Sequence, residues 1–144
     1  MERKTILIVD DDGATAEFLK FVFQDFGGGE EYGCLIASTL AVAWEIASLH
    51  RKELIAIIMD GEVEGEGSFP ASCEFVRNVR RWAGFRGPIV ANSSKDEARR
   101  ALVEAGCDLE SDCKLGRGVA RETPAEMCFR LLKTIEEEAP VPQT

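Results

Sequence analysis

The hydrophobic residues of this chain fall into two patterns that alternate from one end to the other. Short runs of consecutive apolar residues predict strands covered on both faces. These strands are expected at 5–9, 32–37, 54–59, 88–91 and within 107–113. Between them, apolar residues recur every three or four positions, as Phe18, Leu19 and Val22 do, which predicts amphipathic helices. The helices are expected at 14–26 and around 40–47, 75–84, 98–105 and 124–135.

Short signals mark where some of these helices begin and end. Ser94 and Glu97 have the spacing of a capping box, in which the serine hydroxyl accepts a backbone amide and the glutamate reaches back. Thr123 and Glu126 repeat that spacing before the last helix. Gly106 is expected to end the fourth helix.

Five strand–helix units in succession predict an α/β fold, with a doubly wound parallel sheet and helices on both faces. In such folds ligands bind beside the carboxyl ends of the strands. The chemistry should therefore lie in the residues that directly follow each strand. One domain is expected over 4–138, with a disordered tail at 139–144.

The composition narrows the choice of partners. Seventeen Lys and Arg residues stand against 26 Asp and Glu in the 144 residues, so the net charge is −9. That charge argues against direct binding to nucleic acid or to an anionic membrane. No apolar stretch approaches the roughly 18 residues of a spanning helix, and the first residues do not read as a signal peptide. A cytoplasmic location is expected.

The five cysteines are scattered along the chain. No C-x-x-C spacing occurs, and the single histidine, His50, cannot complete a Cys/His zinc site. Buried, reduced thiols are therefore expected, in agreement with a reducing cytoplasm. The five residues are Cys34, Cys73, Cys107, Cys113 and Cys128.

Polar residues stand where the predicted strands end. Asp10, Asp11 and Asp12 follow the first strand, and Asp60 follows the third. Two carboxylates about 4 Å apart repel by roughly 1–4 kcal/mol, so such a group needs a shared proton or a cation. An all-oxygen site of this kind suits Mg²⁺. A hydroxyl and an amine, which can hold phosphoryl oxygens, follow the fourth and fifth strands at Ser93 and Lys114.

With these residues in these places, the chain resembles a response-regulator receiver domain over about 4–138. Residues 6–12, Ile-Leu-Ile-Val-Asp-Asp-Asp, are similar to the family's first-strand motif, in which an acidic pair ends the strand. The resemblance implies the flavodoxin-like strand order 2-1-3-4-5, of which a member of this same family is a well-known example. It also implies a signalling domain that assists its own phosphorylation and dephosphorylation and is not an enzyme acting on a separate substrate.

The resemblance assigns a role to each site residue. Asp60 would accept the phosphoryl group, Ser93 would be the switch hydroxyl, and Lys114 would contact the phosphoryl group. The implied Mg²⁺ ligands are Asp10, Asp11, Asp60 and the backbone carbonyl of Glu62. The implied donor is a phosphohistidine on a histidine kinase or phosphotransfer protein. Phosphorylation would change binding to a downstream protein, and a homodimer could form through the fourth and fifth strand–helix units.

Several positions differ from the family's pattern. Glu64 stands where a proline is usual, and the acidic segment 61–67 is about four residues longer than usual. Lys114 falls one residue late, so Cys113 is the alternative occupant of that place, and the fifth strand lacks an aromatic residue. Glu62 and Lys95 occupy positions that tune dephosphorylation in the family, and an ion pair between them would impede water.

Two alternatives stay open. The first is a pseudo-receiver, which keeps the fold and binds partners without being phosphorylated. The second is a haloacid-dehalogenase-like phosphatase, because Asp10-x-Asp12-Gly13 resembles that family's opening motif, with Asp10 as nucleophile and Asp12 as general acid. The phosphatase alternative leaves Asp60 unexplained.

Overall fold

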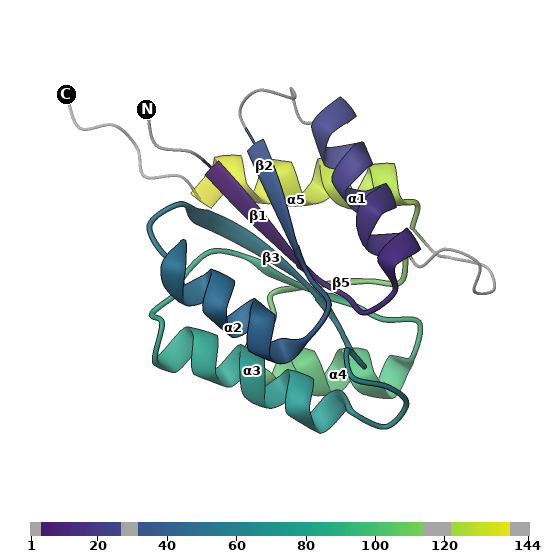
Figure 1. Ribbon diagram of the computed structural model, residues 1–144. Helices are drawn as coiled ribbons and strands as arrows, with labels where there is room; N and C mark the ends of the chain where they lie inside the picture. Colours follow the sequence, from purple (N-terminus) through teal and green to yellow (C-terminus); the bar gives the residue numbers. More distant parts are fainter. Residues whose placement is uncertain (1–3, 27–31, 114–121, 139–144) are drawn as a thin grey trace.

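Strands and helices alternate in the computed structural model, which describes residues 4–26, 32–113 and 122–138 (Figure 1). The strands are β1 (Lys4–Val9), β2 (Tyr32–Ala37), β3 (Leu54–Asp60), β4 (Ile89–Asn92) and β5 (Leu109–Ser111). The helices are α1 (Gly13–Phe26), α2 (Leu40–Leu49), α3 (Phe69–Arg81), α4 (Asp96–Ala105) and α5 (Pro124–Glu138). Within the described ranges, no helix is long and apolar enough to cross a membrane. The tail predicted at 139–144 lies outside the described residues.

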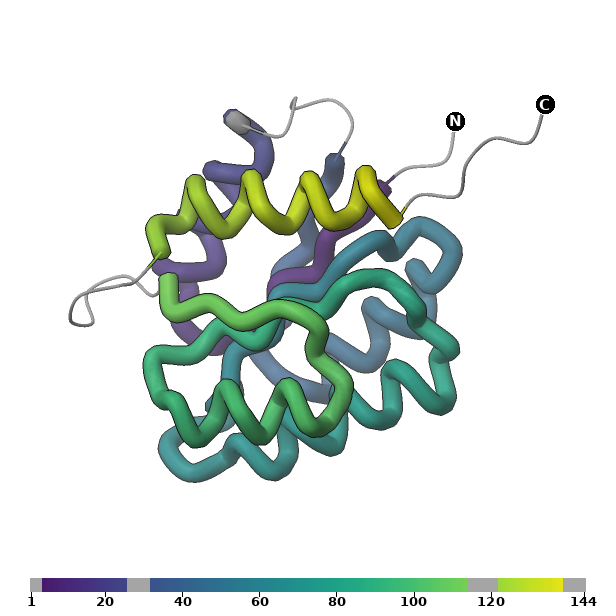
Figure 2. The backbone as a smooth tube through the Cα atoms, turned by 180° about the vertical axis from the view of Figure 1, so that it is seen from behind, coloured from purple at the N-terminus to yellow at the C-terminus, as the bar shows by residue number. Residues whose placement is uncertain are grey.

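The five strands form one parallel sheet in the order β2-β1-β3-β4-β5. Helices α1 and α5 cover one face, and α2, α3 and α4 cover the other (Figure 1, Figure 2). This is the doubly wound order predicted above. The direction of winding reverses between β1 and β3, so the carboxyl ends of these two strands border the expected ligand crevice.

Alternate residues of the central strands enter two separate apolar clusters. Leu7 and Ile57 pack against α2, α3 and α4, whereas Ile8 and Ile58 pack against α1 and α5. All four are at most 1% exposed. Because helices cover both faces of the sheet, the strands need apolar side chains at consecutive positions, which explains the uninterrupted runs in the sequence.

Two aromatic residues differ from the predicted helix faces. Leu19 and Val22 are buried in α1 as predicted, but Phe18 is 41% exposed. Phe23 takes its place in the core because it continues the three- and four-residue spacing, whereas Phe18 lies beside that stripe. The spacing of Leu40, Ala43, Trp44 and Ala47 predicts that Trp44 lies on the buried face of α2, but this residue is 37% exposed.

The two predicted capping boxes have different outcomes. The Thr123 amide donates to Glu126 Oε1 and the Glu126 amide donates to Thr123 Oγ1, both at 3.1 Å, so this box is confirmed. The box at Ser94 is wrong. Lys95 is the residue that caps α4, and its side chain forms no capping hydrogen bond. The hydroxyl of Ser93 accepts the Lys95 amide at 3.2 Å, which delays the start of the helix beyond the predicted cap.

The cysteines are free and buried, as predicted. Burial raises the pKa of Cys107 and of Cys128 to about 12. At neutral pH these side chains are therefore protonated thiols that act as small apolar groups. Cys107 belongs to the core cluster on the α2, α3 and α4 side of the sheet, and Cys128 belongs to the cluster on the α1 and α5 side.

Candidate functional site

The polar residues predicted at the strand ends meet at one edge of the sheet. Asp10 directly follows β1, Asp60 ends β3, and Ser93 directly follows β4. These three strands are parallel neighbours, so their last residues lie side by side. The side chains are largely withdrawn from solvent, since the residues are 2%, 5% and 4% exposed.

Three carboxylates converge there. One oxygen atom from each of Asp10, Asp11 and Asp60 lies within 4.8 Å of the other two. Asp10 and Asp60 are buried and Asp11 is exposed. Oδ1 of Asp10 also accepts the Asp12 amide at 2.9 Å, which orients its carboxylate. Like charges this close are unfavourable unless a proton or a cation is shared between them.

The donor set fits a hard divalent cation. Carboxylate oxygens are the ligands that Mg²⁺ prefers, and the exposed side at Asp11 leaves room for the waters that this ion retains. The fourth predicted ligand, the Glu62 carbonyl, accepts the Gly65 amide at 3.3 Å. A carbonyl oxygen has two lone pairs, so it can accept a second contact beside this hydrogen bond.

A pocket of about 330 Å³ opens beside the carboxylates. It lies between the segments that follow β1, β3 and β4, so each of these strands contributes to its wall. Ser93 lines the pocket together with Asp60, which places a hydroxyl beside the predicted phosphoryl acceptor. The pocket is also lined by Asp11, Asp12, Glu62, Glu66 and Lys95.

Asp12 serves the start of α1. Its Oδ1 accepts the amides of Ala14 at 3.1 Å and Thr15 at 3.3 Å, as an N-terminal cap does. The phosphatase alternative requires the Asp12 carboxylate to act as a general acid. In the structure the same carboxylate caps a helix, which is the role expected of an N-terminal aspartate and does not favour that alternative.

The acidic loop between β3 and α3 is anchored on both sides. Val63 is 1% exposed and enters the core. Gly65 and Gly67 have φ angles of +113° and +81°, which side chains other than glycine rarely allow. Glu64, at the position of the family's proline, turns toward α2 and accepts the Leu40 amide at 3.3 Å. The added residues therefore form a defined turn.

An ion pair connects this loop to the segment after β4. Lys95 Nζ lies 2.7 Å from Glu62 Oε1 and 3.9 Å from Glu66 Oε1. Glu62 Oε2 accepts the Gly67 amide at 2.6 Å, so both of its oxygens are engaged. The predicted pairing of Glu62 with Lys95 is confirmed, and it lies in the wall of the pocket.

Arg99 of α4 holds the main chain behind the pocket, a role that sequence reasoning missed. Its Nη1 donates to the Ser93 carbonyl at 2.6 Å, and its Nη2 bonds the Asp96 carboxylate. Its Nε lies 3.7 Å from Glu110 Oε1 of β5. The side chain is only 9% exposed. The available signal was a charged residue next to Ala98 on the apolar stripe of an amphipathic helix.

Asn92 lies beside Asp60 in the sheet and contacts Cys113. Asn92 is the register partner of Asp60 and is 1% exposed. Its Oδ1 accepts the Cys113 thiol at 3.5 Å, while its Nδ2 has no hydrogen-bond partner among the described residues. Burial raises the pKa of Cys113 to about 11, so this thiol is a donor and not an anion at neutral pH. Lys114, the predicted phosphoryl contact, lies outside the described residues.

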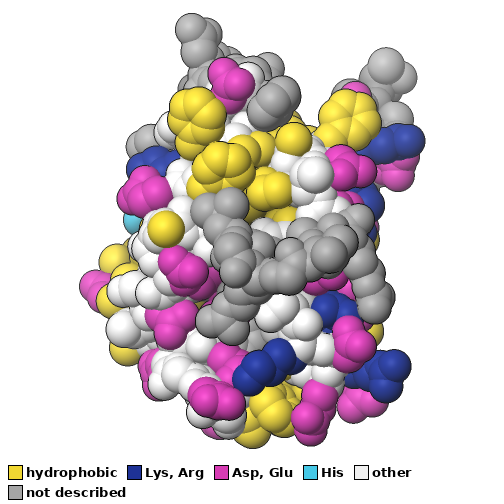
Figure 3. Space-filling view, turned by 90° about the vertical axis from the view of Figure 1, so that its right-hand side faces the viewer, with side chains coloured by type: hydrophobic (Ala, Val, Ile, Leu, Met, Phe, Trp, Pro, Cys, Tyr) yellow, Lys and Arg dark blue, Asp and Glu magenta, His cyan; other side chains and the backbone are white. Residues whose placement is uncertain are grey.

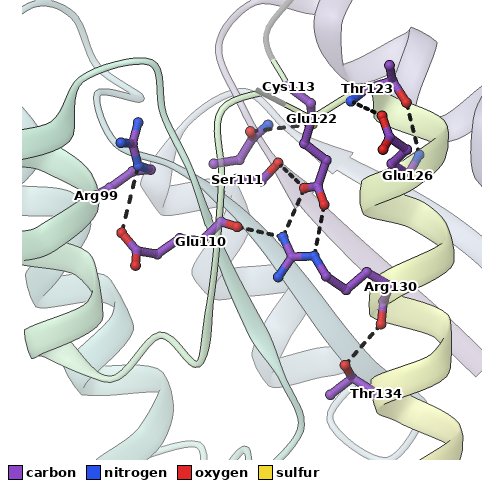
Figure 4. A network of polar contacts seen from close by, with 10 residues as sticks. Arg99, Glu110, Ser111, Cys113, Glu122, Thr123, Glu126, Arg130 and Thr134 are labelled. Atoms are coloured by element: carbon purple, nitrogen blue, oxygen red, sulfur yellow. Dashed lines mark hydrogen bonds and ion pairs between the residues drawn. The ribbon is translucent and has the colours of Figure 1, made fainter. Parts of the chain in front are cut away.

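A second polar network joins β5 to the start of α5 (Figure 4). Arg130 donates to both carboxylate oxygens of Glu122 at 2.9 Å and to the Glu110 carbonyl at 2.5 Å. Ser111 donates to the same Glu122 carboxylate at 2.7 Å. Glu110 thus connects with Arg99 through its side chain and with Arg130 through its backbone.

Comparison with known proteins shows what this fold is. No family model and no curated protein sequence matches the chain. Among solved structures, the chain is similar to a response regulator receiver domain protein from Methanospirillum hungatei JF-1, with 19% identity, a TM-score of 0.66, and 94% and 95% of the two chains covered. The chain is also similar to a putative response regulator from Chloroflexus aurantiacus J-10-fl, with 24% identity and a TM-score of 0.68, and the match covers 93% of this chain and 98% of that one. A third similar structure is a two-component response regulator from Clostridium difficile, with 17% identity and a TM-score of 0.67, and the match covers 96% of this chain and 100% of that one. The chain therefore has the fold of response-regulator receiver domains.

Proposed function

We propose that this chain is a receiver domain of two-component signalling that accepts a phosphoryl group on Asp60. The observation that carries the proposal is the convergence of Asp10, Asp11 and Asp60 within 4.8 Å beside a pocket that also contains Ser93. On a sheet of this topology, that is the edge at which ligands bind.

In the proposed reaction, a carboxylate oxygen of Asp60 attacks the phosphorus atom of a phosphohistidine on a histidine kinase or phosphotransfer protein. The new O–P bond forms as the N–P bond breaks, and the imidazole nitrogen leaves with the electron pair and takes up a proton. The transfer needs mainly positioning and charge compensation, which a nearly buried carboxylate in a polar pocket can provide.

Asp10, Asp11 and Asp60, with the Glu62 carbonyl, would hold the Mg²⁺. When bound, this ion would offset negative charge on the carboxylates and on the phosphoryl oxygens. Lys114 remains the predicted second source of positive charge.

Ser93 is suited to bind the phosphoryl group once it is attached. Its oxygen accepts the Lys95 amide, so its own proton is available to donate to a phosphoryl oxygen. Arg99 fixes the Ser93 carbonyl, which ties the position of this residue to α4 and β5. We infer that phosphorylation shifts this part of the fold between two populations that a downstream protein distinguishes.

The phosphoryl donor and the downstream protein need docking surfaces, and exposed aromatic residues offer one. Phe21 of α1 is 61% exposed and Phe129 of α5 is 75% exposed. Apolar side chains gather over these two helices, at the top of the face in Figure 3. The buried, reduced thiols support a cytoplasmic location, where such partners would be found. Homodimerisation through the fourth and fifth strand–helix units stays a prediction.

Phosphorylation by a small donor tests the proposal directly. The chain is incubated with acetyl phosphate and Mg²⁺ and analysed by intact mass spectrometry. We expect a single phosphoryl adduct that is absent without Mg²⁺ and absent in Asp60→Asn. Ser93→Ala should slow adduct formation about tenfold, because it removes one hydrogen bond to a charged group. Ser48→Ala, a change of an exposed serine on α2 that does not line the pocket, serves as the matched control.

Two other results would overturn the assignment. An adduct that requires Asp10 but not Asp60, together with turnover of a phosphate ester, would indicate the phosphatase. No adduct in the folded chain, even with Mg²⁺ at saturating concentration, would indicate a pseudo-receiver that binds partners without phosphorylation.

A further inference from the structure

A second pocket lies at the opposite end of the sheet, where the strands begin. Its volume is about 470 Å³, and Leu54, the first residue of β3, lines it. Asp60 is the last residue of that strand. Six residues of a strand span about 20 Å, so this pocket is remote from the proposed phosphorylation site. Its side-chain lining comprises Arg51, Leu54, Trp82, Ala83, Phe85 and Arg86.

The floor of this pocket is apolar and its rim is aromatic. Leu54, Ala83 and Phe85 are 7%, 9% and 6% exposed. Trp82, by contrast, is 66% exposed, although burial of so large an aromatic surface would be favourable. The Arg81 guanidinium lies 4.9 Å from the centre of the Trp82 ring, and this cation–π contact helps to fix the orientation of the indole. An exposed indole beside an apolar floor is typical of a binding surface.

Arg80 stabilises the backbone that forms the pocket. Its Nη1 donates to the carbonyls of Phe85 at 3.0 Å and Gly87 at 2.7 Å. Its Nε and Nη2 donate to the Gly106 carbonyl at 3.2 and 3.0 Å. A Cβ atom at Gly87 would lie 2.5 Å from the Ile55 carbonyl, so the backbone packs closely there. A pocket held in this way loses little conformational entropy when a ligand binds.

The rim is basic in a chain that is acidic overall. Arg51 and Arg86 line the pocket and are exposed, and Lys52 and Arg81 are exposed next to lining residues in the sequence. In the part of the chain that the structure describes, no carboxylate forms an ion pair with Arg51 or Arg86. These two guanidinium groups are therefore available to an external anion.

We propose that this pocket binds an acidic peptide segment of a partner protein, in which a large apolar side chain is flanked by carboxylates. The apolar side chain would occupy the floor beside Trp82, and the carboxylates would pair with Arg51 and Arg86. Among the described residues, the lining offers no amide, hydroxyl or carboxylate side chain to bind the edge of a nucleobase, so a peptide fits better than a nucleotide. The proposed binding does not depend on Asp60.

Peptide selection tests this proposal even though the partner is unidentified. Short random peptides displayed on phage are selected in parallel on the intact chain and on the Trp82→Ala variant. We expect sequences specific to the intact chain, each with at least two acidic residues beside Leu, Phe or Trp. Equal enrichment on both proteins, or a neutral or basic consensus, would overturn the proposal. Circular dichroism verifies that the variant is folded.

Affinity measurements with one selected peptide locate the contact. In a Trp44→Phe background, Trp82 is the only tryptophan, so its fluorescence reports binding. We expect about tenfold weaker binding for Arg51→Gln and for Arg86→Gln, because each loses a charge pair at the anchor. Arg100→Gln, an exposed residue on α4, is the matched control and should bind normally.

The outcomes separate this proposal from the proposed phosphoryl transfer. Asp60→Asn should bind the peptide with unchanged affinity, whatever its effect on phosphorylation. A loss as large in Arg100→Gln as in Arg86→Gln would reduce the interaction to net charge alone and overturn the pocket. Binding of a mononucleotide in competition with the peptide would reassign the pocket to nucleotides.

Discussion

Lys95 is exposed over nearly half of its side-chain surface, yet its amine lies 2.7 Å from the largely buried Glu62 carboxylate. Exposed ion pairs contribute little to stability, about 0–1 kcal/mol. At this position the consequence is access, because the pair lies in the wall of the pocket that contains Asp60. Water that hydrolyses an aspartyl phosphate at Asp60 would enter through this pocket, whose wall includes the pair.

Breaking the pair should therefore shorten the lifetime of the phosphorylated protein. We expect Glu62→Gln and Lys95→Gln each to hydrolyse about threefold faster, the change in rate that corresponds to an exposed pair of roughly 0.6 kcal/mol. The decay is followed by intact mass spectrometry after removal of acetyl phosphate. The exchanged variant, with Glu62→Lys and Lys95→Glu, should restore slow decay, and Glu97→Gln is the charge-matched control. Identical decay in all variants would show that the pair does not restrict water.

At the scale of elements, Arg99 connects three parts of the fold. It belongs to α4, bonds the main chain after β4 through the Ser93 carbonyl, and lies 3.7 Å from the Glu110 carboxylate of β5. β5 has only three residues, so such side-chain connections supplement a short ladder of backbone hydrogen bonds. The Arg130–Glu122 pair continues the connection to α5.

Removal of the Arg99 side chain should lower the free energy of unfolding substantially. We expect Arg99→Ala to lose about 2–3 kcal/mol, because a buried carbonyl and nearby carboxylates lose their donor. Urea unfolding measures this loss. Arg100→Ala, the exposed neighbour, should change stability by less than about 0.5 kcal/mol. Equal effects of the two substitutions would contradict the role given to Arg99.

The start of α5 should show a defined pH dependence. Hydrogen bonds from the Thr123 amide and hydroxyl hold the pKa of Glu126 below its usual range. A carboxylate with a lowered folded-state pKa stabilises the protein above its unfolded pKa, and this contribution is lost as the pH falls through the folded value. Glu126→Gln should therefore be less stable than the original chain at pH 7, and the difference should disappear on acidification below the folded-state pKa. Urea unfolding at several pH values measures the difference, with Glu136→Gln as the control. A difference that persists in acid would contradict the assignment.

At the scale of the whole molecule, the charges are distributed unevenly. Acidic residues concentrate where the strands end, at Asp10, Asp11 and Asp60, while Arg51 and Arg86 border the pocket where the strands begin. A net charge of −9 therefore conceals two ends of opposite character. A cation is expected at one end and an acidic partner at the other.

Mg²⁺ should stabilise the folded chain if it binds at the carboxylates. A ligand at ten times its Kd contributes about 1.4 kcal/mol, which raises Tm by about 3–5 °C for a domain of this size. Differential scanning calorimetry with and without Mg²⁺ measures this shift. Asp11→Asn should lose most of it, and Asp25→Asn, an exposed change of the same kind on α1, should retain it. A shift that survives in Asp11→Asn would place the ion elsewhere.

The sequence by itself determined the order of elements, the doubly wound sheet and the grouping of Asp10, Asp60 and Ser93. Each of these follows from short-range patterns: apolar runs define strands, and a parallel sheet brings the residues after its strands to one edge. The pairing of Glu62 with Lys95 was also predictable, because the resemblance to receiver domains places both residues beside the site.

Only the tertiary structure decided which side chains support the site and which surfaces stay open. Arg99 looks like an ordinary charged helix residue until α4 docks against β5 and buries it. Ser94 has the spacing of a cap, but the Ser93 hydroxyl accepts the Lys95 amide and α4 begins only at Asp96, so Lys95 occupies the capping position. The basic pocket unites Arg51, Trp82 and Arg86 from two separate loops. These features depend on contacts between residues far apart in the chain, and no local periodicity encodes such contacts.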